Sequence, residues 1–394
     1  MKPELLSPVS SFETLHAAIK GGCDAVYLGL KEFNMRESAR NFTLSELKKV
    51  SLICKDNNVK IYLTLNTIIY DNEIERIGGI LKKIKGLADA VICWDFSVIN
   101  LCRGLKIPIH ISTQASVANS KTAEFYKSLG AERIILAREL NLKQIKKISN
   151  IIPIECFCHG AMCVAVSGRC FTSQFLHCES ANRGECIHPC RRGYIVKDEE
   201  GNELKLENSR VLSAKDLCTL PFIEKMKKAG IKAFKIEGRN RNPEYVYTVT
   251  KIYRKALDRK LSKKELKESL KELSKVYNRG FSSGFYIKMP TSDDFSYTEH
   301  GEQKEKKQFV GRIEKYWKNP GVAHIRMFAG KLKIGNEVYI QGKKTFFRAK
   351  IESMEINHKK IHEAEKGQDV GIKLSECKKG DEVFLIKKKI NNQA

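Results

Sequence analysis

The chain has 394 residues, of which 42% are hydrophobic and 30% are charged. That composition is typical of a folded globular protein, and the length predicts two or three domains with at least one large core. A small disulfide-stapled scaffold and a wholly disordered chain are therefore excluded. Lys plus Arg outnumber Asp plus Glu by 71 to 46, a formal charge of +25. This surplus favours nucleic acid as a partner, with a solvated lysine-rich surface as the alternative.

The start of the chain lacks the charged and apolar regions of an export signal, and no apolar run approaches the roughly 20 residues of a membrane span. We therefore expect a cytoplasmic protein with no membrane partner. Thirteen cysteines in such a protein indicate metal binding and not a disulfide framework.

Short apolar runs alternate with amphipathic segments along residues 1–290. Eight such units predict an α/β fold, a closed TIM-like (β/α)8 barrel. An open doubly wound sheet is the alternative, but no glycine fingerprint follows the first strand. The predicted strands are 5–9, 25–29, 61–65, 90–94, 107–112, 133–137, 152–157 and 233–237.

Polar side chains follow the predicted strands where each strand ends. Catalytic groups of such barrels sit at these carboxyl ends, although Asp, Asn and Thr there often cap the next helix instead. We expect about half of the set to be structural. Its members are Arg36, Asn41, Asn66, Asp95, Thr113, Gln114, Arg138, Glu139, His159, Glu237 and Arg239.

A cysteine-rich insert at 160–232 separates the seventh and eighth predicted strands. Cys163, Cys170, Cys186 and Cys190 have the spacing C-x6-C-x15-C-x3-C. Four thiolates suit either zinc or an iron-sulfur cluster, and the lack of a C-x2-C pair favours the cluster. An insert after the seventh strand lies over the barrel mouth, where a redox group would contact substrate.

A second domain follows the barrel. Residues 291–307 are polar and predict a linker, and residues 308–394 carry short alternating strands without a convincing helix. This pattern predicts a small all-β barrel. It resembles the second domain of translational GTPases and indicates an accessory role.

The insert also carries a signature: E-C-F-C-H-G-A-M-C at 155–163, S-G-R-C at 167–170, A-N-R-G-E-C at 181–186 and P-C-R at 189–191. It resembles that of the collagenase-like peptidases classed as family U32. Further matches lie at 4–8, 112–114, 138–140, 235–239 and 278–281, so the resemblance spans nearly the whole barrel.

The resemblance implies oxygen-independent hydroxylation. Members of this family hydroxylate a tRNA uridine, a ribosomal RNA cytidine or the ubiquinone ring, and prephenate is implicated as the hydroxyl source for the RNA substrates. It also implies a 4Fe-4S cluster on Cys163, Cys170, Cys186 and Cys190. The charge of +25 and the C-terminal barrel favour the RNA branch, with tRNA or ribosomal RNA as partner and an electron donor if the cluster transfers electrons.

We therefore expect an RNA uridine hydroxylase with a substrate site at the barrel mouth. His159 and Glu237 are the candidates for proton transfer. Arginines there would bind prephenate carboxylates or phosphate by bidentate hydrogen bonds. The predicted substrate-binding residues are Arg36, Asn41, Gln114, Arg169, Arg183 and Arg239.

Two alternatives stay open. A peptidase could use Cys163 and His159, but thiolates that bind a metal are not free nucleophiles. A non-catalytic RNA-binding protein would use the metal site as a structural staple. Cys158 and Cys178 lie outside the family pattern, and Cys156 and Cys158, being in alternation on a strand, are expected to be buried together.

Overall fold

The computed structural model describes residues 2–37, 39–195, 197, 199–201, 212–298, 301 and 305–388. The chain forms two compact units, Met1–Glu302 and Gln303–Ala394. Each unit has its own hydrophobic core. No described helix is long and apolar enough to cross a membrane.

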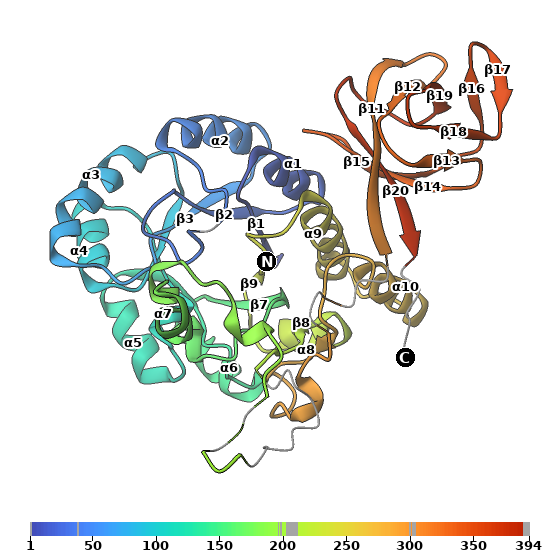
Figure 1. Cartoon of the computed structure of the whole chain (residues 1–394). Coiled ribbons are helices and arrows are strands. Elements are labelled where there is room, and N and C mark those ends of the chain that lie inside the picture. The colour runs from blue at the N-terminus through green and yellow to red at the C-terminus, as the bar shows by residue number, and fades with distance from the viewer. Residues whose placement is uncertain are drawn as a thin grey trace. The chain divides into compact units, whose positions relative to one another are not determined.

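Eight parallel strands of the first unit close into a barrel, as the sequence predicts (Figure 1). They are β1 (Glu4–Pro8), β2 (Ala25–Gly29), β3 (Lys60–Thr64), β4 (Ala90–Cys93), β5 (Ile109–Ile111), β6 (Ala131–Ile135), β7 (Ile154–Gly160) and β9 (Ala233–Ile236). Each pairs with its neighbour in sequence, and β9 closes the ring by pairing with both β1 and β7. All residues of β2, β7 and β9 are buried, because helices cover the outside and side chains fill the inside.

Helices connect these strands and surround the barrel. Several begin at a side chain that accepts a hydrogen bond from the first turn, among them Ser11, Thr43 and Asp95. Asp95 therefore caps a helix, as we expected for part of the strand-end set. The helices are α1 (Phe12–Lys20), α2 (Leu44–Asp56), α3 (Ile74–Ile84), α4 (Phe96–Leu105), α5 (Ser120–Ser128), α6 (Leu142–Ile148), α8 (Ile223–Lys228) and α9 (Pro243–Asp258).

The insert between β7 and β9 contains little regular structure. Its helix α7 (Thr172–His177) lies within the ring of barrel helices in Figure 1. Three short turns accompany it, η3 (Val166–Gly168), η4 (Ala181–Arg183) and η5 (Pro189–Arg191). The insert also contains β8 (Asp216–Cys218), which runs antiparallel to β7 and is too short to show in the sequence pattern. β8 also pairs with β10 (Phe281–Ser282), and α10 (Lys263–Leu273) precedes β10.

The second unit is antiparallel and all-β, as predicted. Its strands are β11 (Glu305–Trp317), β12 (Val322–Met327), β13 (Lys331–Lys333), β14 (Glu337–Gln341), β15 (Phe346–Lys350), β16 (Met354–Ile356), β17 (Lys359–Ile361), β18 (Glu363–Glu365), β19 (Asp369–Lys373) and β20 (Glu382–Lys388). The predicted linker at 291–307 differs from the structure at both ends. Phe295 bridges to Ala214 and so belongs to the first unit, whereas β11 begins at Glu305.

Candidate functional site

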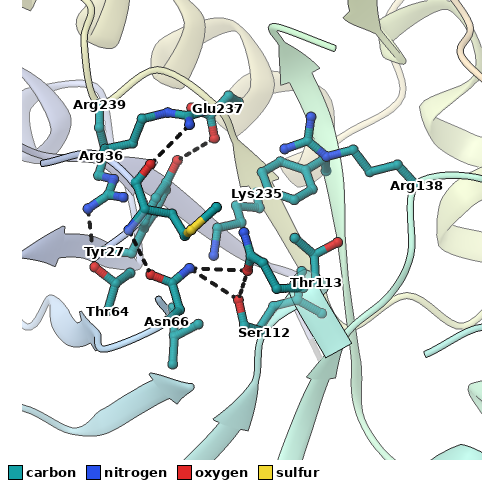
Figure 2. Close-up of a pocket in the computed structure, with 15 residues that line it drawn as sticks. Tyr27, Arg36, Thr64, Asn66, Ser112, Thr113, Arg138, Lys235, Glu237 and Arg239 are labelled. Atoms are coloured by element: carbon teal, nitrogen blue, oxygen red, sulfur yellow. Dashed lines mark hydrogen bonds and ion pairs between the residues drawn. The ribbon is translucent and has the colours of Figure 1, made fainter. Parts of the chain in front are cut away.

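Polar side chains gather at the carboxyl end of the barrel around a small cavity of about 50 Å³, which we call the inner chamber (Figure 2). Figure 2 shows them pointing into this common space from strands on all sides of the barrel. The lining residues are Tyr27, Met35, Arg36, Thr64, Asn66, Ile92, Ser112, Thr113, Gln114, Ile135, Arg138, Phe157, Lys235, Glu237 and Arg239.

The chamber carries a net positive charge. Lys235 is neutralised by buried Glu155, whose Oε1 lies 2.9 Å from Nζ of Lys235. Three arginines then face the one remaining carboxylate, Glu237. These arginines are Arg36, Arg138 and Arg239, so the described lining has an excess of two positive charges.

The Glu237 carboxyl stays ionised in this setting. Burial alone would raise its pKa, but four surrounding cations outweigh burial and hold the pKa below its usual range. Its Oε1 lies 3.6 Å from Nη2 of Arg36. Burial lowers the pKa of Arg239 to about 10, which still leaves this guanidinium charged at neutral pH.

Neutral hydrogen bonds fix the rest of the chamber. Asn66 Nδ2 donates to Oε1 of Gln114 at 3.2 Å and to Oγ of Ser112 at 3.3 Å. Arg239 Nη1 donates to Oδ1 of Asn34 at 2.9 Å and to Oγ1 of Thr64 at 3.1 Å. The chamber is therefore preorganised, because each polar group is held in place before any ligand enters.

The inner chamber adjoins a larger cavity of about 300 Å³, which we call the thiol cavity, and the two share lining residues. All four predicted metal ligands line it: Cys163, Cys170, Cys186 and Cys190. Residues common to both cavities include Arg36, Gln114, Arg138 and Glu237. Among the described residues, no group of three or more His, Cys, Asp or Glu side chains converges as it would on a metal ion.

Hydrogen-bond donors accompany the sulfurs. The Thr172 amide donates to Sγ of Cys170 at 3.4 Å, and Ser173 Oγ donates to Sγ of Cys186 at 3.9 Å. The Cys170 amide donates in turn to Oδ1 of Asn182. Such donors stabilise thiolates, so this loop environment suits sulfur ligands.

The insert is attached to the loops that carry the chamber residues. The Glu37 amide donates to the carbonyl oxygen of Gly184 at 3.1 Å. Gly184 has φ of +103°, and a Cβ there would lie 2.2 Å from the carbonyl oxygen of Asn34, so only glycine fits. This contact holds the insert against the loop of Arg36.

His159 lies away from both cavities, which corrects its assignment as a proton-transfer residue. It is buried between the barrel and α9, with Nδ1 3.3 Å from Oη of Tyr253. Rings of Tyr245, Tyr253 and Phe281 pack around it. Since β7 residues alternate and Phe157 faces the chamber, the side chain of His159 is directed elsewhere by a bulge in the β7–β9 pairing.

Three predicted substrate-binding residues also lie outside the cavities. Asn41 Nδ2 donates to the carbonyl oxygens of Arg36 and Glu37, so it supports the Arg36 loop. Arg183 binds both carboxylate oxygens of Glu73 and is engaged in that pair. Arg169 is exposed and donates to Oγ of Ser116 at 3.0 Å. The structure thus brings Arg36, Gln114, Arg239 and Glu237 together, but not these three.

Two residues that line the chamber were not predicted, Tyr27 within β2 and Lys235 within β9. Nζ of Lys235 lies 4.1 Å from the centre of the Tyr27 ring. Lys235 could have been found from the sequence, because a charged residue inside an apolar strand must have a buried partner. Cys156 and Cys158 are buried, as expected.

Comparison with known proteins identifies relatives of both units. The model of peptidase family U32 matches residues 10–295. The chain belongs to peptidase family U32. The model of elongation factor Tu domain 2 matches residues 321–384, within the all-β unit.

Relatives in the U32 family carry two kinds of name. A collagenase of Porphyromonas gingivalis is 38% identical over 98% of both chains. An uncharacterized protease of Methanocaldococcus jannaschii is 42% identical over 98% of this chain and 99% of its own. A tRNA hydroxylation protein P of Escherichia coli is 30% identical over 79% of this chain and 80% of its own.

Proposed function

We propose that this U32 protein hydroxylates C5 of a tRNA uridine without molecular oxygen, with prephenate as the source of the hydroxyl group. The observation that carries the proposal is a cationic chamber that shares lining residues with a cavity lined by four thiols. The relative named for tRNA hydroxylation supports the RNA substrate. Ribosomal RNA is the alternative nucleic acid, and the charge of +25 suits either one.

The arginines between the inner chamber and the thiol cavity suit a dianion. Prephenate carries two carboxylates, which match the excess of two positive charges around Glu237. Arg36 and Arg138 stand where the chamber meets the thiol cavity, so they can each bind a carboxylate through two N–H groups. Gln114 and Asn66 offer neutral donors that would orient the ring of the ligand.

The four thiolates would hold a 4Fe-4S cluster, which would supply redox or Lewis-acid chemistry beside the chamber. Replacing C5–H by C5–OH is a two-electron oxidation of the base, so the two electrons must pass either to the prephenate molecule that gives up its hydroxyl oxygen or, through the cluster, to an external electron acceptor. Zinc would require four sulfurs within about 2.3 Å of one point. Thiols that line a cavity of about 300 Å³ suit the wider cluster better.

Glu237 is the residue best placed to accept a proton. Hydroxylation at C5 releases the C5 proton, and an ionised carboxylate at the junction of the two cavities can take it. The low pKa of Glu237 keeps it in the accepting form at neutral pH. Tyr27 Oη lies 3.4 Å from Oε2 and would help orient the carboxylate.

The test uses the full chain purified without oxygen. Iron and sulfide are measured first, and the protein is then incubated with unmodified tRNA and prephenate, with and without a chemical electron acceptor. Mass spectrometry of the digested nucleosides should detect 5-hydroxyuridine only when prephenate is present. Hydroxycytidine in ribosomal RNA would redirect the proposal to that substrate, and unchanged nucleosides in both RNAs would refute it.

A peptidase is the second candidate, because two full-length relatives are named as proteases. The structure does not assemble the Cys163 and His159 pair, since His159 is packed against Tyr253 and only Cys163 lines a cavity. Gelatin and a collagen-like peptide, each incubated with the metal-loaded protein, test this candidate. Cleavage that is lost in Cys163→Ala and retained in His159→Phe would identify a protease that depends on Cys163 but does not pair it with His159.

A further inference from the structure

Large apolar side chains of the insert are exposed beside the thiol cavity. Phe175 is 84% exposed and Phe171 is 64% exposed, and their ring centroids lie 6.2 Å apart. Leu176 of α7 is also exposed. The Ile187 amide donates to Oγ of Ser173, which places exposed Ile187 against the same helix. We call Phe171, Phe175, Leu176 and Ile187 the aromatic platform.

The platform and the thiol cavity lie on two sides of one short helix. Thr172 and Ser173 of α7 line the cavity, while Phe175 on the same helix faces solvent. Two platform residues directly follow predicted cluster ligands, Phe171 after Cys170 and Ile187 after Cys186. A molecule that enters the cavity past α7 therefore passes over this surface.

The volume of the thiol cavity indicates which part of an RNA substrate would lie on the platform. The thiol cavity measures about 300 Å³, and a cluster held by its four thiols would occupy part of that space, so no more than a single nucleotide of a longer chain fits beside it. The flanking nucleotides of an RNA must then rest on the surface at its edge. Aromatic rings accept any base by stacking, and apolar aliphatic side chains fill in around them.

Charge around the platform agrees with RNA. Between residues 161 and 195 the chain has four arginines and two glutamates. Arg169 and Arg192 are exposed there, and Arg192 follows η5, which packs on α7. Exposed guanidinium groups can contact the phosphates of nucleotides whose bases stack on the rings.

We infer that the aromatic platform of α7 stacks the bases that flank the modified nucleotide of the RNA substrate. The inference rests on the proposed function. The platform is the surface that would hold the RNA beside the thiol cavity. The platform acts by positioning RNA and contacts neither the reacting base nor prephenate.

Binding of unmodified tRNA to the full chain tests the inference. Phe175→Ala should raise the Kd for tRNA about tenfold, since one aromatic stack is lost. Phe175→Tyr should restore binding, whereas Phe175→Leu, which is apolar but cannot stack, should not. Leu52→Ala is the matched control, because Leu52 is 64% exposed on the outer face of α2 and lies outside the insert.

Kinetics and metal analysis separate the alternatives. In Phe175→Ala the KM for tRNA should rise, while the KM for prephenate and the iron content stay at wild-type levels. Wild-type tRNA affinity in Phe175→Ala, in a protein that still forms 5-hydroxyuridine, would overturn the inference and leave the function standing. If Phe175→Ala keeps wild-type tRNA affinity but an acidic redox protein reduces its cluster more slowly than that of the wild type, the inference is also overturned, and the platform would bind a protein partner instead. Platform-dependent tRNA binding without any hydroxyuridine would support the platform and refute the proposed reaction.

Discussion

The Arg36 guanidinium lies 3.6 Å from the Glu237 carboxylate, and the two residues reach each other from loops on either side of β1. Both line the inner chamber and the thiol cavity, so the pair marks the junction between them. The insert contacts the loop of Arg36 through Gly184. The loop of Arg36 therefore both supplies a positive charge to the chamber and contacts the insert.

Arg36→Gln should shift the pH dependence of hydroxylation. Arg36 is one of the cations that lower the pKa of Glu237, so its loss lets burial raise that pKa. Because an ionised Glu237 is required, the acidic limb of the kcat/KM profile should move to higher pH. The KM for prephenate should also rise about tenfold or more, since a charged hydrogen bond is lost.

Arg36→Lys is the control for this prediction. It keeps the positive charge beside Glu237 but loses the bidentate geometry. The pH profile should stay near that of the wild type while the KM for prephenate still rises. An unchanged acidic limb in Arg36→Gln would contradict the assignment of Glu237 as the proton acceptor.

The barrel was predictable because its signal is repeated eight times and each strand is long enough to show an apolar run. The gathering of four cysteines around one cavity was predictable because they lie close together in a single insert. Tyr27 and Lys235 could not be predicted from a position after a strand end, because they lie within β2 and β9. His159 lies outside the chamber because a bulge in the β7–β9 pairing turns its side chain away. Arg183 lies outside because it is bound to Glu73. Neither the bulge nor the Glu73 contact can be recognised from spacing along the chain.

Loss of any predicted cluster ligand should lower metal content. Replacing one thiolate of four leaves an incomplete ligand set, so Cys163→Ser, Cys170→Ser, Cys186→Ser or Cys190→Ser should each reduce bound iron and sulfide severalfold. Cys178→Ser is the matched control, since Cys178 is exposed in the same insert and lies outside the cavity lining. Full iron content in the four variants, or loss in Cys178→Ser, would contradict the ligand assignment.

The Lys235–Glu155 pair should be a strong determinant of stability. Both side chains are buried, and Glu155 Oε2 also lies 3.3 Å from Arg133. Glu155→Gln leaves a buried ammonium without its counter-charge, so the free energy of unfolding should fall by about 3 kcal/mol in urea titrations. The double variant Glu155→Gln with Lys235→Met should lower the free energy of unfolding by less than the sum of the decreases in the two single variants. Lys121→Ala, which breaks an exposed ion pair, should leave stability at the wild-type value.

His159→Phe should reduce the acid sensitivity of the fold. Burial lowers the pKa of His159 to about 4, whereas an unfolded histidine titrates near 6.5. The folded state therefore has its full stability above pH 6.5 and loses it as the pH falls toward 4, because the unfolded chain binds the proton first. Between pH 7.5 and 4.5 this histidine accounts for about 2 kcal/mol of lost unfolding free energy.

Urea titrations at the two pH values measure this difference in the wild type and in His159→Phe. Phenylalanine keeps an aromatic ring among Tyr245, Tyr253 and Phe281, so the difference between pH values should shrink without a large loss at pH 7.5. Because His159 lies outside both cavities, His159→Phe should also retain the pH profile of hydroxylation. A loss of turnover at full stability would return this residue to the reaction.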